Sequence, residues 1–299
     1  MTAVPLPQVE GVTHRDVHAR GLRFHVAEAG PGPGSGGTES LPVVLLHGWP
    51  QHWFMWRDVI PGLATDRRVI APDLRGLGWS DAPKSGYLKQ ELADDVLAVL
   101  SELGVERFDL IGHDWGAFAG FLMCLTAPER VGHYVGCSIP HLWPPQERPS
   151  LRRLFNLWYQ VALGSPGLGA GLMRNGRFTA QVLQVARSHG DYTPDELATF
   201  VDVLREPEHA HATSMYYRTF LKHELRPLIS GAMKQQTLTT PTHLLWGRRD
   251  QILQGAKNQG DHEPYAPNMK IEWVDDTGHF LPEERPELVV QRARELFAS

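Results

Sequence analysis

The sequence predicts an α/β fold in which a mostly parallel central sheet is flanked by helices and interrupted once by a helical insertion. Short apolar segments alternate with helical segments through the first half of the chain, as in parallel strands joined by crossover helices. This alternation stops after residue 140 and resumes near residue 242. The 299 residues are long for one core, and the 42% hydrophobic content is enough to build a sizeable one.

The strands of the first half are expected from short apolar runs bounded by turn residues, at 22–27, 43–46, 68–71, 108–111 and 131–138. Helical spacing predicts the intervening helices at 53–64, 89–103 and 115–125. The helix at 89–103 is the clearest, because its apolar residues recur on one face and Gly104 follows its end. The glycine- and proline-rich run 30–37 predicts a surface loop, since no strand-to-helix turn follows it directly.

The second half predicts how the chain is divided. Residues 142–236 contain helical segments and loops but no convincing strand, whereas strand-like runs return at 242–246 and 270–274. A final helix is expected over 284–297. We therefore expect a core domain of residues 1–141 and 237–299, with a helical cap domain of residues 142–236 inserted after the sixth strand. Such a cap would lie over the carboxyl ends of the strands, where ligands bind in open α/β sheets.

Composition argues against several kinds of partner. Lys and Arg number 29 against 34 Asp and Glu, which gives a net charge of −5 without a basic cluster. We therefore expect neither nucleic acid nor a membrane as a partner. No apolar run reaches the roughly 18 residues of a membrane helix, and residues 1–11 lack the pattern of a signal peptide. Only Cys124 and Cys137 occur, so the expected location is the cytoplasm.

The motif most indicative of chemistry is Gly112-His113-Asp114-Trp115-Gly116. It follows an apolar strand and opens a helix, and its small residues allow a tight strand-to-helix turn that exposes the middle side chain. Such a turn usually carries serine as the nucleophile, and here it carries Asp114. An ordinary helix N-terminal aspartate is the alternative, but the flanking glycines favour a nucleophile.

Two later segments complete a predicted triad. Asp250 follows the strand at 242–246, and His279 lies in a loop after the last strand, so that nucleophile, acid and histidine occur in the order expected of this architecture. Asp250 could instead be a simple turn residue, and His279 competes with 14 other histidines. Upstream, Trp49 follows the strand at 43–46. The backbone N–H groups of Trp49 and Trp115 are the predicted donors to an oxyanion.

These motifs resemble the α/β-hydrolase superfamily over nearly the full chain, and more narrowly the epoxide hydrolases and the related haloalkane dehalogenases. The residues that carry the resemblance are the segments 47–50, 73–80 and 112–116 together with Asp250 and His279. It implies an α/β-hydrolase fold and an epoxide hydrolase activity. We expect no cofactor, because water is the co-substrate, and we expect a monomer or homodimer.

An aspartate nucleophile suits attack on saturated carbon, because a carboxylate is already ionised near pH 7. Attack on an epoxide carbon would leave an alkyl ester on Asp114. His279 would then activate a water molecule that cleaves this ester, while Asp250 orients the imidazole and stabilises its cation.

The resemblance also implies two cap tyrosines that polarise the epoxide oxygen and supply a proton. It assigns them to Tyr159 and Tyr217, with Tyr216 as the alternative to Tyr217, since one residue of slip turns a helical side chain by about 100°. All three could instead be packing residues. The expected pocket for a small apolar epoxide includes Trp49, Trp115, Phe155 and Tyr216.

Other functions remain as alternatives at this point. A haloalkane or haloacid dehalogenase would use the same Asp114, Asp250 and His279. A non-catalytic binding scaffold is disfavoured by the complete set of catalytic residue types, and a serine esterase by the missing serine. The fragments 209–211 and 261–263 contain histidines and acids but lack the spacing of a metal site, so no metal is expected.

Overall fold

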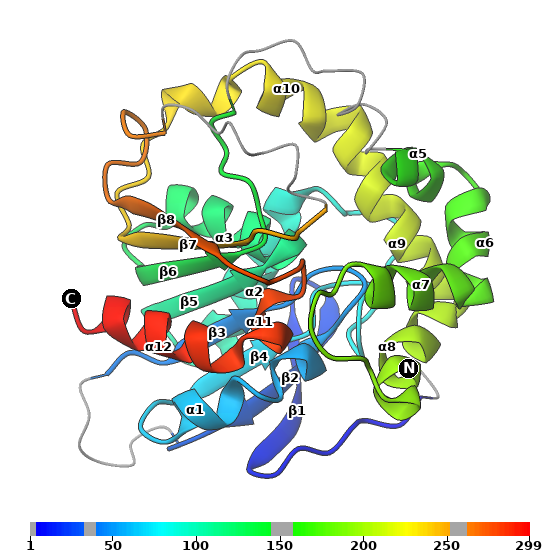
Figure 1. Ribbon diagram of the computed structural model, residues 1–299, viewed down its shortest axis with the longest axis horizontal. Helices are drawn as coiled ribbons and strands as arrows, with labels where there is room; N and C mark the ends of the chain where they lie inside the picture. The colour runs from blue at the N-terminus through cyan, green and yellow to red at the C-terminus, as the bar shows by residue number, and fades with distance from the viewer. Residues whose placement is uncertain (1–3, 33–39, 145–157, 252–261) are drawn as a thin grey trace.

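An eight-stranded sheet with the order β1–β2–β4–β3–β5–β6–β7–β8 forms the centre of the computed structural model (Figure 1). The model describes residues 4–32, 40–144, 158–251 and 262–299. The strands are β1 (Val12–Ala19), β2 (Leu22–Ala29), β3 (Val43–Leu46), β4 (Val69–Pro72), β5 (Phe108–His113), β6 (Val131–Cys137), β7 (Thr242–Gly247) and β8 (Met269–Val274).

The predicted, mostly parallel sheet is confirmed. The six strands β3 to β8 pair in parallel with one another, whereas β1 pairs antiparallel with β2, and β2 pairs antiparallel with β4. The sequence did not predict β1, because its apolar residues Val12 and Val17 lack the alternation of a half-buried strand. The predicted strands end within one residue of the observed ones, apart from the carboxyl ends of β2 and β5, which extend two residues further, to Ala29 and His113.

Helices cover both faces of the sheet. α2 (Lys89–Glu102) and α3 (Asp114–Thr126) lie on one face, and α1 (Ile60–Ala64), α11 (Leu281–Glu284) and α12 (Pro286–Phe297) lie on the other (Figure 1). All four residues of β3 are buried for this reason. Val44 and Leu46 pack into the cluster with α2 and α3, while Val43 and Leu45 pack into the opposite one.

One predicted helix is divided in the structure. The segment 53–64 forms a 3₁₀ turn, η1 (Trp53–Trp56), followed by α1. The closing helix, predicted over 284–297, is α12, which has Pro286 in its first turn and is preceded by the separate short helix α11. Proline lacks a backbone N–H and is favoured at a helix start, so Pro286 marks a new helix rather than the middle of one.

The chain between β6 and β7 contains only helical elements among its described residues. They are α5 (Trp158–Gly164), α6 (Leu168–Asn175), α7 (Arg177–Val185), α8 (Pro194–Arg205), α9 (Pro207–Thr219), the π-helical turn η2 (Phe220–Glu224), α10 (Leu225–Ile229) and the 3₁₀ turn η3 (Ala232–Gln235). The predicted helical insertion after the sixth strand is thus confirmed, although its treatment as a separate domain, residues 142–236, stays a prediction.

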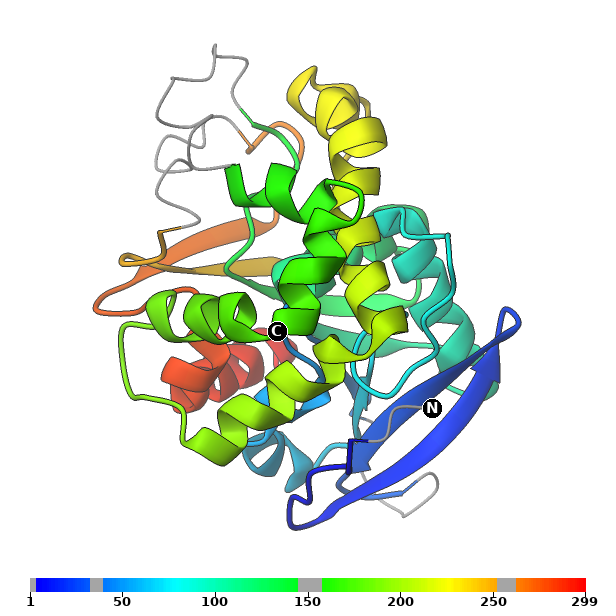
Figure 2. The same cartoon turned by 90° about the vertical axis from the view of Figure 1, so that its right-hand side faces the viewer.

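These inserted helices gather on one side of the sheet, where α9 packs against α5, α6 and α8 (Figures 1 and 2). Nowhere in the described ranges does a helix combine the length and apolar character needed to cross a membrane. The side chains of α9 reach the loops that follow β3 and β5, which brings the insertion to the carboxyl ends of the central strands.

Candidate active site

Asp114 lies at the sharp turn between β5 and α3. Its φ of +51° falls in the left-handed region, which a non-glycine residue rarely adopts. The neighbouring glycines make this turn possible, because a Cβ atom on Gly112 would lie 2.7 Å from the Ala117 Cα. A Cβ atom on Gly116 would lie 2.3 Å from the His47 carbonyl oxygen. The small residues of the motif therefore serve the close packing that the sequence predicted.

Two backbone N–H groups hold the Asp114 carboxylate. The Trp49 N–H donates to Oδ1 over 2.9 Å, and the Trp115 N–H also hydrogen-bonds to this carboxylate. The loop after β3 comes so near that a Cβ atom on Gly48 would lie 2.3 Å from the Asp114 Cβ. His47 holds that loop, since its Nδ1 donates to the Gly48 carbonyl over 3.1 Å and its Nε2 accepts the Leu74 N–H over 3.0 Å.

His279 and Asp250 lie beside Asp114. The His279 Nδ1 hydrogen-bonds to Asp250 Oδ2 over 2.8 Å, and the His279 Nε2 faces Asp114 Oδ2 at 3.8 Å. Asp250 and His279 are buried. Their loops pack without room for a side chain between them, because a Cβ atom on Gly247 would lie 2.2 Å from the Gly278 carbonyl oxygen. The structure thus brings together the three residues of the predicted triad.

Burial and neighbouring charges shift the pKa values of His279 and Asp114. Burial by itself would lower the pKa of His279, but the Asp250 carboxylate, with Asp114 and Glu284, outweighs it and raises that pKa above the ordinary 6.5. Burial raises the pKa of Asp114, and His279 together with the Trp115 and Trp49 N–H groups opposes that rise. The carboxylate form of Asp114 is therefore stabilised by dedicated partners rather than by solvent.

Tyr217 of α9 and Tyr159 of α5 come together over the two tryptophans. The ring centroids of Tyr159 and Tyr217 are 6.0 Å apart, and Tyr217 lies 5.4 Å from Trp49 and 5.7 Å from Trp115. Burial raises the pKa of both phenols, with a further rise caused by the negative charge of Asp114. Both hydroxyls therefore stay protonated at neutral pH and are available as hydrogen-bond and proton donors.

Tyr216 lies apart from this group. It is fully buried, its hydroxyl donates to the Arg75 carbonyl oxygen over 2.8 Å, and its ring packs 5.4 Å from that of Tyr87. Its place is therefore between α9 and the loop after β4 rather than beside Asp114. Phe155, the remaining predicted pocket residue, lies outside the described residues.

The histidine-rich fragments show no metal-site geometry. His209 and His211 each hydrogen-bond to a backbone carbonyl, those of Gly76 and Lys84. Within the described part of the chain, no group of three or more His, Cys, Asp or Glu side chains is placed to hold a metal ion. Asp261 of the second fragment is not among the described residues.

Sequence reasoning missed a buried lysine behind the site. The Lys89 ammonium lies 4.6 Å from the Trp115 ring centroid, donates to the Tyr216 carbonyl oxygen over 2.8 Å and pairs with Glu224 at 3.1 Å. It thus ties α9 and η2 to the start of α2 and packs on the ring of Trp115, the residue that follows Asp114. One signal was present in the sequence, because Lys89 falls on the same helical stripe as Leu92 and Val96.

The chain is similar to a known protein family and to individual known proteins. Residues 42–286 match the family model described as the alpha/beta hydrolase fold. The chain is 32% identical to the soluble epoxide hydrolase of Corynebacterium sp. (strain C12), over 96% of this chain and 98% of that protein. It is 28% identical to the AB hydrolase superfamily protein YfhM of Bacillus subtilis (strain 168), over 95% of this chain and 97% of that one.

A solved structure shows similarity over nearly the whole chain. The structure of the epoxide hydrolase CorEH without ligand superimposes with a TM-score of 0.83 and 29% sequence identity, covering 96% of this chain and 99% of that one. The similarity therefore includes the sheet and the helices inserted between β6 and β7.

Proposed function

The chain belongs to the α/β-hydrolase fold family and, within it, to the epoxide hydrolases, and on this premise we propose that it converts an epoxide to a vicinal diol through an alkyl ester on Asp114. The observation that carries the proposal is an aspartate at the strained turn after β5, with His279 at 3.8 Å and a backbone N–H on its carboxylate. A carboxylate in this position is a nucleophile for saturated carbon.

In the first step, Asp114 Oδ2 attacks one carbon of the epoxide. Oδ1 is engaged by the Trp49 N–H, which leaves Oδ2 as the attacking oxygen. The bond between that carbon and the epoxide oxygen breaks, and the electron pair moves to the oxygen. Tyr159 and Tyr217 hydrogen-bond to this oxygen, and one of them transfers its proton, so that a hydroxyl rather than an alkoxide is formed.

In the second step, water cleaves the ester. The His279 Nε2 removes a proton from a water molecule, which attacks the carbonyl carbon of the Asp114 ester. The Trp49 and Trp115 N–H groups stabilise the negative charge on the tetrahedral intermediate. Asp250 holds the imidazolium through Nδ1. The intermediate collapses, and the diol oxygen takes a proton from His279. Asp114 is released as a carboxylic acid, and its proton passes to the tyrosinate, which restores the carboxylate and the phenol.

The pair of tyrosines favours an epoxide over a halide as the leaving group. A halide departs as a stable anion and needs no proton, whereas the oxygen of an opened epoxide does. One observation supports a dehalogenase as the second candidate, because the buried Trp49 indole N–H has no acceptor within the described residues and could hold a halide. Diol formation from styrene oxide, measured beside bromide release from a bromoalkane, separates the two activities.

The direct test of the ester is to remove the base that cleaves it. His279→Gln should still react with styrene oxide and should accumulate an Asp114 adduct, which mass spectrometry of the intact protein and of its peptides detects. Asp114→Ala is the control and should form no adduct. The absence of an adduct on Asp114 in His279→Gln, with a substrate that the unaltered enzyme converts, would refute the mechanism.

A further inference from the structure

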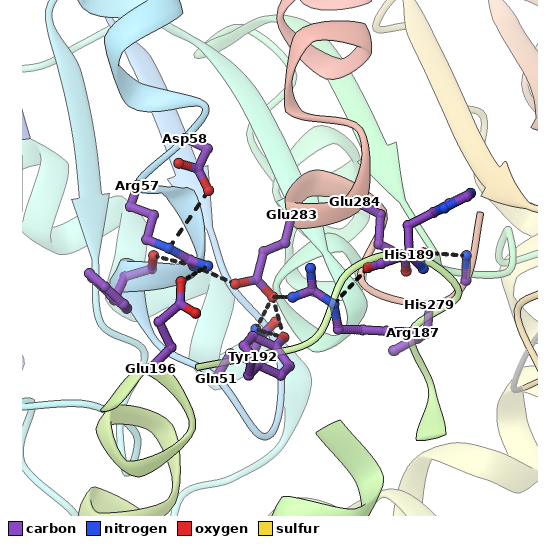
Figure 3. Close-up of polar contacts among 12 residues, drawn as sticks. Gln51, Arg57, Asp58, Arg187, His189, Tyr192, Glu196, His279, Glu283 and Glu284 are labelled. Carbon is purple, nitrogen blue, oxygen red and sulfur yellow. Dashed lines mark hydrogen bonds and ion pairs between the residues drawn. The ribbon is translucent and has the colours of Figure 1, made fainter. Parts of the chain in front are cut away.

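Two adjacent glutamates at the end of α11 connect the loop of His279 to the inserted helices (Figure 3). Glu283 and Glu284 follow His279 by four and five residues, and both are buried. Their carboxylates contact the chain between α7 and α8, residues 186–192, which we call the docked segment. Neither glutamate has a part in the mechanism proposed above.

Glu284 bridges the docked segment and the loop of His279 through one oxygen atom. Its Oε2 accepts the N–H of Gly278 over 2.9 Å, that of Ser188 over 2.9 Å and that of His189 over 3.1 Å. These groups are packed closely, since a Cβ atom on Gly278 would lie 2.5 Å from the Ala186 carbonyl oxygen. Three N–H donors on one charged oxygen make a strong, directional connection.

The backbone of His279 itself is held from two sides. Its N–H donates to the Ala186 carbonyl oxygen over 2.8 Å, so the docked segment contacts the residue directly. Its carbonyl oxygen accepts a hydrogen bond from the His113 Nε2 over 2.9 Å. The hydrogen bond with Asp250 orients the His279 ring, but it does not fix the position of the His279 backbone. The position of the backbone therefore depends on His113 and on the docked segment, and Glu284 holds the second of these.

Glu283 secures the far end of the same segment. It accepts hydrogen bonds from the Tyr192 hydroxyl and from the Gln51 Nε2, and it pairs with the Arg57 guanidinium.

Gln51 belongs to the loop that presents the Trp49 N–H, since the Gln51 N–H donates to the Gly48 carbonyl oxygen over 3.0 Å. Arg57 also pairs with Glu196 of α8 over 2.8 Å. The docked segment is therefore attached to the loop of Trp49 as well as to the loop of His279.

We infer that Glu284 is a positioning residue that holds His279, through the docked segment, in the geometry needed to cleave the ester. The inference rests on the function proposed above. It assigns Glu284 to the second step alone, because the first step depends on Asp114 and the tyrosines, none of which contacts this carboxylate. The rate of ester cleavage is thus coupled to the seating of the docked segment between α7 and α8.

The test separates ester formation from ester cleavage in single-turnover experiments with styrene oxide, followed by quenching and mass spectrometry. Glu284→Ala should leave the rate of ester formation unchanged and slow ester cleavage by about 10- to 100-fold, so that the Asp114 adduct accumulates. Glu287→Ala removes an exposed carboxylate three residues away, at the start of α12, and should keep both rates.

Two conservative variants distinguish positioning from a general effect on folding. Glu284→Gln keeps an acceptor at the position of Oε2, and Oε1 has no partner to lose among the described residues, so cleavage should largely recover. Glu284→Asp keeps the charge but withdraws the carboxylate by one methylene group, and its cleavage rate should lie between those of the other two. This comparison also holds if Glu284→Ala does not fold.

The inference is overturned if Glu284→Ala and Glu284→Asp keep the ratio of the two rates found in the unaltered enzyme, or if Glu284→Gln loses as much cleavage as Glu284→Ala. The His279→Gln protein is measured in the same series. If it accumulates the adduct while Glu284→Ala and Glu284→Asp do not, the positioning role fails and the proposed function stands. If no adduct forms in His279→Gln, the proposed function itself fails.

Discussion

Asp114 combines a strained backbone with a carboxylate held by two backbone N–H groups. The turn places Oδ2 beside the His279 Nε2, and the Trp49 N–H holds Oδ1 where an oxyanion would form. A site arranged in this way needs no reorganisation when charge develops, which is the main source of electrostatic catalysis. Each neighbouring residue can therefore be tested for one step at a time.

Tyr217 and Tyr216 form a matched pair of adjacent phenols in different surroundings. Tyr217→Phe removes the proposed proton donor and should slow ester formation by about 100-fold. Tyr216→Phe removes only the bond to the Arg75 carbonyl oxygen, so it should cost about 1 kcal/mol of stability and leave ester formation unchanged. Single-turnover rates and denaturant unfolding measure both effects. A slow Tyr216→Phe beside a normal Tyr217→Phe would reverse the assignment.

The pH dependence of ester cleavage should report the pKa of His279. The imidazole must be neutral to accept a proton, so the rate should fall as pH decreases through that pKa, which the Asp250 carboxylate raises against the effect of burial. In the ester Asp114 carries no charge, which leaves Asp250 as the principal carboxylate partner. Asp250→Asn should therefore slow cleavage and move this acidic limb to lower pH by about one unit or more. A limb that stays in place would contradict the account.

The residues of the triad could be predicted from the sequence because each belongs to a local motif directly after a strand. The choice between Tyr216 and Tyr217 could not, since it depends on how α9 is rotated against Arg75 and Lys89. The sequence also contains no local pattern from which a role for Glu284 could be predicted. Its role depends on N–H groups of Ser188 and His189, which are more than 90 residues away in the chain.

At the scale of elements, central strands such as β3 were predictable because both of their faces are buried, which produces a continuous apolar run. The sequence did not predict β1, because only Val12, Val17 and Ala19 of its eight residues are apolar. The division of the segment 53–64 into η1 and α1 depends on packing, which periodicity does not record. The strand-to-helix turn after β5 was the most predictable element, since its steric demands select the residues themselves.

The contact between α3 and the loop after β3 should tolerate no side chain at Gly116. Gly116→Ala would place a methyl group 2.3 Å from the His47 carbonyl oxygen, and backbone cannot move aside easily. We expect a loss of about 1–3 kcal/mol in the free energy of unfolding. Gly171→Ala in α6 is the control. It meets nothing within 4 Å and should raise stability by up to about 1 kcal/mol. Equal stabilities would refute the steric argument.

At the scale of the whole molecule, the sheet and the inserted helices each supply part of the proposed chemistry. The carboxyl ends of β3, β5, β7 and β8 lead into the loops of Trp49, Asp114, Asp250 and His279, while α5 and α9 supply Tyr159 and Tyr217. The docked segment joins the two parts beside His279. The sequence predicted that an insertion exists and where it begins, but its seating arises from long-range contacts such as Arg57 with Glu196 and Glu283.

The central claim is that water attacks the enzyme's own ester rather than the substrate. A single turnover in water enriched in ¹⁸O, with enzyme in excess over styrene oxide, tests it most directly. The account predicts that the heavy isotope enters the carboxylate of Asp114, while the first diol carries an unlabelled oxygen taken from that side chain. Label in the diol and none in the peptide that contains Asp114 would contradict it.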